Sequence, residues 1–209
     1  MGEKIKFIIF DGQKVVQRVA SAMEDAALLA EIQCMVVLKQ KLGCALVTPQ
    51  VINDPRGKFT VPFSIENLHS LGLPFEQVYQ LNHSFTNEKG TLRGPNYQDP
   101  FPQAKIIRCV RGSLYSVGIC LEGENKGKWV GFELSSERME EMYIPRGYAH
   151  GFITLEDNTE LEYITDNRYC YEGAKSIKWD ALGIDWTVGG RVLVREDLLS
   201  EKNRNAPRL

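Results

Sequence analysis

The sequence has few of the residues that mark disulfide-rich or metal-binding proteins. Its five cysteines are odd in number and include no C-x-x-C pair, so neither a disulfide framework nor a zinc knuckle is expected. It has only three histidines, His69, His83 and His150. Because these show no H-x-H or H-x₃₋₅-H spacing, the sequence argues against a metal site. We therefore predict neither a metal nor a cofactor.

An excess of one charge and long apolar runs are missing as well. The 25 Lys and Arg against 27 Asp and Glu give a formal net charge of -2, which provides no basic field of the kind that nucleic-acid backbones require. No apolar run approaches the roughly 18 residues needed to span a bilayer, and the N-terminus lacks the pattern of a signal peptide. We expect a cytoplasmic protein with reduced thiols that binds neither nucleic acid nor membrane.

The first part of the chain predicts a strand followed by a helix. The chain of 209 residues is 43% hydrophobic, which is enough for one well-buried core. Residues 4–10 are typical of a short strand. From about Val15 to Lys41 apolar residues recur mostly every three or four positions, which predicts an amphipathic helix closed by Gly43. This helix either packs on its own sheet, as most amphipathic helices do, or forms an interface.

From Cys44 onwards, short apolar runs alternate with Gly, Pro, Asn and Asp. Five runs have strand length and are rich in β-branched and aromatic residues: 115–121, 128–134, 141–144, 151–155 and 161–165. This pattern is typical of an antiparallel sandwich or barrel. One or two helical turns are expected near 135–142, and the polar tail 201–209 is expected to be peripheral.

Several motifs in this region carry a distinctive set of polar residues. They read NDPRGKF at 53–59, QLNHS at 80–84, TLRGPNYQ at 91–98 and IPRGYAHGF at 144–152. Together they resemble the dTDP-4-dehydrorhamnose 3,5-epimerase family, from near Cys44 to about Pro207. The resemblance implies a mainly β fold, a double-stranded β-helix (jelly-roll, cupin-like), after an N-terminal strand and amphipathic helix. We divide the chain into an N-terminal extension, 1–42, and an epimerase-like domain, 43–209.

The resemblance also identifies two positions where this chain departs from the family. There, an Arg-Gly-Leu-His-Tyr-Gln run carries the base that removes protons beside a 4-keto group, and an Asp near the C-terminus orients that His. Asn96 and Asn203 stand at these positions. An amide is no base near neutral pH, and a general base contributes about 10² to 10⁴ in rate. The resemblance implies that Asn96 and Asn203 are in contact, and two neutral amides can hydrogen-bond to each other.

Further site residues follow from the resemblance. Lys105 occupies the position that supplies a cation to the enolate oxygen, and His150 lies in a run that lines the same cavity. The tyrosine that acts as general acid in the family aligns with Tyr169, and Tyr171 is the alternative residue for that role. Arginine can meet phosphate oxygens bidentately, and the residues expected to bind the sugar nucleotide are Arg56, Phe59, Gln80, Asn82, Arg93, Arg108 and Phe152.

The leading hypothesis is a homodimer that binds a nucleoside-diphospho-4-keto-6-deoxy sugar, dTDP-linked or related, with Arg56 and Phe59 approaching the neighbour's pocket. One alternative is a different isomerisation, a single-centre epimerisation or an elimination on a sugar nucleotide, using Tyr or His150. Another is a non-catalytic sugar-nucleotide sensor, or a partner of an active epimerase that docks through residues 15–41. A binding protein needs the arginines and Lys105 but no base, whereas an enzyme needs a titrating group.

Overall fold

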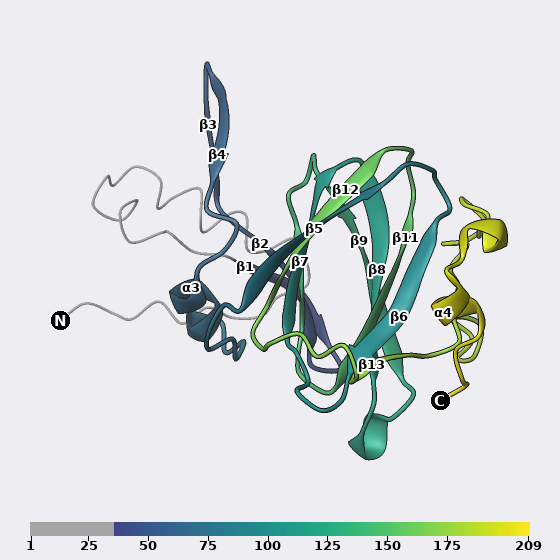
Figure 1. Cartoon of the computed structure of the whole chain (residues 1–209). Helices are drawn as coiled ribbons and strands as arrows, with labels where there is room; N and C mark the ends of the chain where they lie inside the picture. Colours follow the sequence, from purple (N-terminus) through teal and green to yellow (C-terminus); the bar gives the residue numbers. More distant parts are fainter. Residues whose placement is uncertain (1–35) are drawn as a thin grey trace.

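Two antiparallel sheets face each other (Figure 1). One consists, in spatial order, of β1 (Val36–Lys41), β2 (Cys44–Thr48), β10 (Glu141–Ile144), β7 (Lys105–Arg111), β12 (Thr159–Thr165) and β5 (Gln80–Thr86). The other consists of β13 (Ala174–Ser176), β6 (Leu92–Gln98), β11 (Tyr148–Thr154), β8 (Ser113–Cys120) and β9 (Trp129–Ser135). The computed structural model describes residues 36–209. The mainly β jelly-roll fold is confirmed, and the five predicted strand runs correspond to β8 to β12 within a few residues.

The core lies between the sheets because successive side chains of a strand point to opposite faces. At one end of the sandwich the inward side chains are apolar and buried, and they include Leu46, Ile107, Leu114, Leu134, Met142 and Leu161. Each fully buried side chain of this size contributes about 1.5–3 kcal/mol of transfer free energy. Burial of these side chains holds the two sheets together.

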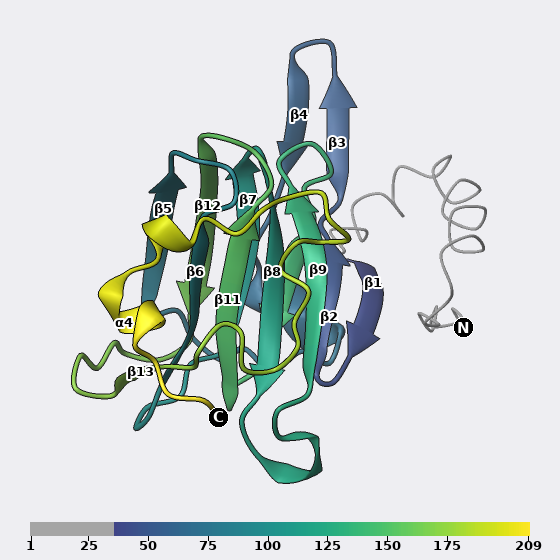
Figure 2. The same ribbon diagram turned by 90° about the vertical axis from the view of Figure 1, so that its right-hand side faces the viewer.

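The outer face of each sheet is covered by a segment of helix or loop. Helix α3 (Ile65–Ser70) lies on the six-stranded sheet, and Leu68 and Phe75 are buried there. The segment 177–199 covers the five-stranded sheet and buries Trp186. Figure 2 shows this C-terminal part of the chain, in yellow, in front of β11 and β8. None of the helices in this part of the chain, which starts at residue 36, is long and apolar enough to cross a membrane.

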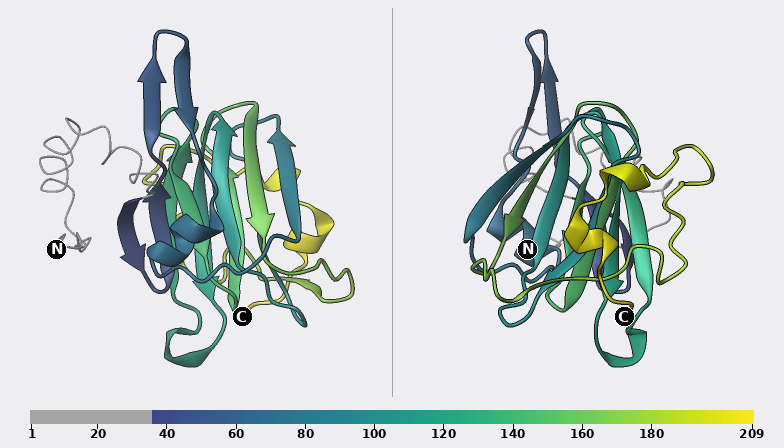
Figure 3. Two further views of the ribbon diagram at one scale, coloured as in Figure 1. Left: turned by 90° about the vertical axis from the view of Figure 1, so that its left-hand side faces the viewer. Right: turned by 45° about the vertical axis from the view of Figure 1, so that its right-hand side comes forward.

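A hairpin of β3 (Val51–Asp54) and β4 (Gly57–Thr60) stands away from both sheets, as the two views of Figure 3 show. Its tip carries Arg56, and Phe59 on β4 is exposed. A two-stranded hairpin is marginally stable by itself in water. Ile52 on β3 is exposed as well, so two large apolar side chains lie on the surface of this hairpin.

The predicted helix that ends at Lys41 is wrong over its last residues. Val36–Lys41 is β1, which pairs with β2 in an antiparallel hairpin. Leu42 and Gly43 both have positive φ, 50° and 79°, which gives the tight turn that such a hairpin needs. The preceding part of the predicted helix and the predicted strand at 4–10 lie outside the described residues. The division into an extension, 1–42, and a domain stays a prediction, although β1 already belongs to the sheet.

Two shorter predictions have different outcomes. The helical turns expected near 135–142 amount to a single turn, closed by a hydrogen bond from the Met139 amide to the Ser135 carbonyl oxygen (3.0 Å). The tail at 201–209 is not peripheral, since helix α4 (Glu201–Arg204) packs near β6 and buries Asn203 to 6% exposure. Two residues of the tail are buried, Asn203 and Ala206. The composition of the tail did not reveal this, because one of the two is polar and the other is small.

We expect Gly151→Ala to destabilise the five-stranded sheet. A Cβ at Gly151 would lie 3.1 Å from the Pro95 backbone and 3.2 Å from the Trp186 ring. Strand β6 is hydrogen-bonded to β11 on one side and to β13 on the other. Its backbone therefore cannot move away from the new Cβ as a flexible side chain could. Overpacking of this kind costs about 1–3 kcal/mol of unfolding free energy. Urea denaturation followed by circular dichroism measures the change, and an unchanged midpoint would contradict this account of the packing.

Candidate functional site

A cavity of about 830 Å³ opens between the two sheets. Its walls come from β5, β6, β7, β11 and β12, and from residues 198–203. The polar residues that line it are Asn82, His83, Ser84, Thr91, Arg93, Asn96, Lys105, His150, Tyr163, Ser200, Lys202 and Asn203. None of these described lining residues is a carboxylate, while three are Lys or Arg. The cavity therefore suits an anionic ligand.

Asn96 and Asn203 are hydrogen-bonded to each other in the wall of this cavity. Asn203 Nδ2 donates to Asn96 Oδ1 at 3.1 Å. Ser176 Oγ donates to the same Asn96 oxygen at 2.6 Å, and Ser200 Oγ donates to Asn203 Oδ1 at 2.9 Å. The Gly94 amide N–H also donates to Asn203 Oδ1, at 3.3 Å. The contact that the sequence predicted is therefore present, within a larger neutral network.

The local sequence explains how Asn203 reaches β6. Ser200 precedes α4 and accepts a hydrogen bond from the Asn203 amide nitrogen at 3.2 Å, as an N-cap residue does. This cap fixes the first turn of the short helix. The side chain of Asn203, in that turn, then points at Asn96.

Lys105 begins β7 and places its amine between the sheets. Burial lowers the pKa of Lys105 from its ordinary value to about 8, because desolvation disfavours the charged form. Its Nζ lies 5.9 Å from the ring centroid of Tyr163. Within residues 36–209 no carboxylate lies within ion-pairing distance of this amine. Lys105 is therefore a cation that a ligand can neutralise.

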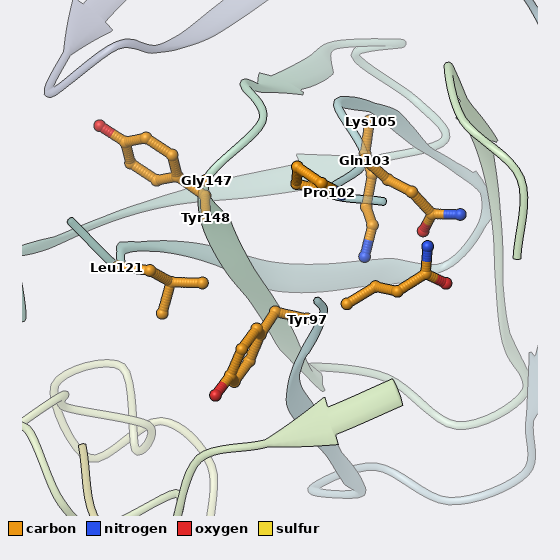
Figure 4. A pocket seen from close by; sticks show the side chains of 8 residues that line it. Tyr97, Pro102, Gln103, Lys105, Leu121, Gly147 and Tyr148 are labelled. Carbon is orange, nitrogen blue, oxygen red and sulfur yellow. The ribbon is translucent and has the colours of Figure 1, made fainter. Parts of the chain in front are cut away.

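Lys105 also lines a second, smaller pocket. It has a volume of about 20 Å³, and Figure 4 shows the Lys105 side chain extending toward it beside Gln103, above Tyr97. A space of that size holds about one water molecule. This pocket is too small for a sugar, so the larger cavity is the candidate site.

His150 lies opposite Asn96 in the ladder between β11 and β6. The side chain is buried, with 7% of the residue exposed, and its Nε2 lies 3.0 Å from Ser116 Oγ. Its ring stacks on Phe152 with centroids 6.0 Å apart. Burial, and then the charge of Lys105, hold the pKa of His150 well below its ordinary value, so the imidazole is neutral at pH 7.

Three of the predicted ligand-binding residues line this cavity: Asn82, Arg93 and Phe152. Arg93 is also tied to the neighbouring strand, since its Nη2 donates to the Phe85 carbonyl oxygen at 3.2 Å. Gln80 is not among the lining residues. Its amide donates to Asn82 Oδ1 at 2.8 Å, so it orients a residue that lines the cavity.

Other predicted residues are not brought to this chain's own cavity. Arg56 lies at the tip of the hairpin, with 90% of its side chain exposed and an ion pair to Asp54 at 2.6 Å. Phe59 is exposed on the same hairpin. Arg108 points to the outer face of the six-stranded sheet and pairs with Glu162 at 2.7 Å. Strand alternation explains this placement. Lys105 points inward, and a residue three positions later on the same strand lies on the opposite face of the sheet.

Both candidate tyrosines lie outside the cavity lining. Tyr169 is 57% exposed and Tyr171 is 79% exposed, so neither is buried near Asn96. The aromatic hydroxyl that does line the cavity belongs to Tyr163 on β12, whose pKa is raised, first by burial. Sequence reasoning did not single out Tyr163.

The sequence also missed three other residues of the site. Lys202 stands beside Asn203, so its place in the cavity could have been read from the same run. Ser176 and Ser200 carry the amide network, but a serine before a helix or at the end of a strand gives no specific signal. In the described part of the chain, no group of three His, Cys, Asp or Glu is placed to hold a metal ion.

Comparison with known proteins gives consistent results. The family model described as dTDP-4-dehydrorhamnose 3,5-epimerase matches residues 40–209. A protein of that name from Shigella flexneri is 36% identical over 175 residues, which cover 80% of this chain and 96% of the relative. The Bacillus anthracis enzyme, solved with TDP and PPi bound, superposes with a TM-score of 0.77 at 31% identity, covering 84% of this chain and 100% of the other.

A third relative was solved with a sugar nucleotide. It is a dTDP-6-deoxy-D-glucose-3,5-epimerase from Legionella pneumophila in complex with dTDP-4-keto-L-rhamnose, with a TM-score of 0.76 and 30% identity over 83% of this chain and 92% of the other. The family model covers most of the chain, and the fold is shared with these enzymes over nearly their whole length. On this evidence, the chain belongs to the dTDP-4-dehydrorhamnose 3,5-epimerase family.

Proposed function

We propose that this protein binds a nucleoside-diphospho-4-keto-6-deoxy sugar in its cavity and is a very poor 3,5-epimerase. One observation carries this proposal: Asn96 and Asn203, at the positions where the resemblance implies the base dyad, form an amide pair in a cavity that is also lined by Arg93, Lys105 and Lys202. An amide cannot take a proton from carbon as an imidazole can. The cations of the cavity thus support ligand binding, and the amide pair in its wall supports the loss of the reaction.

The charges of the cavity support the ligand class. Arg93, Lys105 and Lys202 line it, and a diphosphate is an anion that such side chains bind through charge-assisted hydrogen bonds. The solved Legionella relative holds a dTDP-linked 4-keto sugar, and the Bacillus enzyme holds TDP and PPi. The Legionella ligand has both a diphosphate and a keto sugar, and the Bacillus ligands carry the diphosphate without the keto sugar.

The remaining chemistry of the site lacks one component of an epimerase. Removal of a proton beside a ketone leaves an enolate oxygen, which a fixed cation stabilises in a dry site. Lys105 can supply that cation, since it is protonated below about pH 8 and has no carboxylate partner in the described residues. A proton acceptor at the carbon is still required. Asn96, at the expected position, does not provide one.

A second candidate function is an altered reaction at one carbon. The observation in its favour is His150, a buried neutral imidazole in the same cavity. A neutral imidazole can accept a proton, and His150 is held in place by Ser116. In this alternative His150, which pairs with Asn96 in the same wall of the cavity, removes a single proton. Exchange at one carbon separates this alternative from a binding protein.

We also propose a twofold dimer in which the hairpin completes the neighbour's site. Arg56 and Phe59 lie on an element that stands away from its own chain (Figure 3). Edge strand β5 carries two exposed apolar side chains, Leu81 and Phe85. Exposed sheet edges and apolar patches are commonly covered by pairing between subunits.

We expect the affinity for dTDP to fall as pH rises through about 8. Lys105 is charged below its pKa of about 8 and attracts the diphosphate, and it becomes neutral above that pH. Calorimetric titration between about pH 6.5 and 9.5 measures this, with Lys105→Met expected to bind more weakly at pH 7 and to lose the pH dependence. Lys126→Met, on an exposed loop, is the control and should behave as wild type. If dTDP does not bind even at millimolar concentration, the ligand class is wrong.

The wild-type protein is expected to exchange the C3 and C5 protons of dTDP-4-keto-6-deoxyglucose very slowly. The rate should recover only when both positions are restored, in Asn96→His with Asn203→Asp, because an imidazole needs the carboxylate that fixes its tautomer and stabilises its charged form. NMR in deuterated water follows the exchange for wild type, each single variant and the double variant. The gain from the double change is expected to reach about 10² or more.

Each other outcome of the exchange experiment has a distinct meaning. Rapid exchange at both carbons by the wild type would refute the lost dyad. Exchange at a single carbon that Ser116→Ala or a His150 substitution removes would favour the altered reaction. Binding of the ligand without exchange would favour a sensor or a partner of an active epimerase.

Arg56→Ala is expected to weaken dTDP binding without changing the oligomeric state or the thermal stability. Its side chain contacts only Asp54 within its own chain in the described structure, so the loss must arise at the partner's site. Lys58→Ala, an exposed residue of the same hairpin, is the matched control. Light scattering that shows a monomer at micromolar concentration would count against the dimer.

A further inference from the structure

The direction of the amide network is fixed by one backbone group. The Gly94 N–H can only donate, so the Asn203 atom 3.3 Å from it must be the oxygen, Oδ1. Ser200 agrees with this assignment, because its Oγ accepts from the Asn203 backbone amide (3.2 Å) and its hydroxyl proton is available for Oδ1 (2.9 Å). The amide nitrogen of Asn203 must then face Asn96.

The orientation of Asn96 follows from that of Asn203. Nδ2 of Asn203 can donate hydrogen bonds but cannot accept them. The Asn96 atom 3.1 Å away must therefore be the acceptor, Oδ1. Ser176 Oγ donates to the same oxygen at 2.6 Å. Both acceptor sites of the Asn96 oxygen are occupied, and the oxygen cannot rotate toward the cavity without breaking two hydrogen bonds.

The Asn96 nitrogen is left with its two N–H groups. Nδ2 of Asn96 makes no hydrogen bond to any residue between 36 and 209, and it is not among the buried atoms that lack a partner. Asn96 itself lines the cavity, so this nitrogen is accessible there. Arg93 and Lys105, in the walls of the same cavity, also present donors only.

We propose that Asn96 donates a hydrogen bond from Nδ2 to an oxygen on the ring of the bound sugar. This inference rests on the proposed function and deepens it, because it names what the former base position recognises. A group that would take a proton from the ligand is replaced by one that gives a hydrogen bond to it. The cavity then selects a sugar nucleotide with a carbonyl or hydroxyl oxygen facing Asn96, and holds it without reaction.

Asn203→Asp tests the proposal by reversing the network. A carboxylate still accepts from Gly94 and Ser200, but it cannot donate, so Asn96 must turn its Nδ2 toward Asp at position 203. The Asn96 oxygen then faces the cavity and repels the sugar oxygen. The affinity for dTDP-4-keto-6-deoxyglucose is expected to fall about tenfold, while the affinity for dTDP, which lacks the keto hexose, changes much less.

Two further variants make the result specific. Asn96→Leu removes the donor without adding charge, and it should give the same selective loss even if Asn203→Asp does not fold. Asn125→Asp makes the same amide-to-acid change outside the cavity, where Lys128 contacts the side chain at 2.9 Å, and should leave both affinities unchanged. All affinities are measured by calorimetry at pH 7, and folding is checked by thermal denaturation.

The outcomes separate this inference from the proposed function. If wild type binds both ligands and the variants keep the ratio of the two affinities, the donor role of Asn96 is overturned and the proposed function stands. If wild type binds neither ligand, both are overturned. A selective loss of the keto sugar in the folded variants supports the inference.

Discussion

Alternation of side chains along facing strands determines both the core and the site of this protein. On β7, Lys105 and Ile107 point between the sheets while Arg108 points outward to Glu162. Where the inward residues are apolar they join the sheets, and where they are polar they line the cavity. The position of each cation therefore depends on strand register, since a shift by one residue would exchange Lys105 for an outward residue. The rigid core fixes the geometry of the site.

The amide pair is physically coherent with its buried surroundings. A lone carboxylate at position 203 would be buried, because Asn203 is 6% exposed, and a buried charge without a cationic partner is costly. Asn203 donates one hydrogen bond to Asn96, and Ser176 and Ser200 donate to the two amide oxygens. Neither amide is a base near neutral pH. A retained binding site with a changed reaction is thus physically consistent with the whole network.

The sequence predicted the fold and several residues of the cavity lining, but it predicted few of the side-chain contacts that position those residues. Alternating runs located β8 to β12, and the matched motifs placed Asn96, Lys105 and His150 in one cavity. The helix ending at Lys41 was wrong, because three consecutive apolar residues at 36–38 fit a strand as well as a helix. Local periodicity also carries no information on tertiary partners, so Ser176 and Ser200 were not predicted, and the inward position of Asn203 followed only from the resemblance.

A crystal structure of the wild-type protein with dTDP-4-keto-6-deoxyglucose tests the central claim, that a binding site persists without a base, most directly. We expect the diphosphate within hydrogen-bonding distance of Arg93, and the sugar ring beside the Asn96 amide nitrogen with its configuration unchanged at C3 and C5. An imidazole or tyrosine oxygen in line with either carbon, with an inverted centre, would contradict the account. So would a ligand bound outside the cavity.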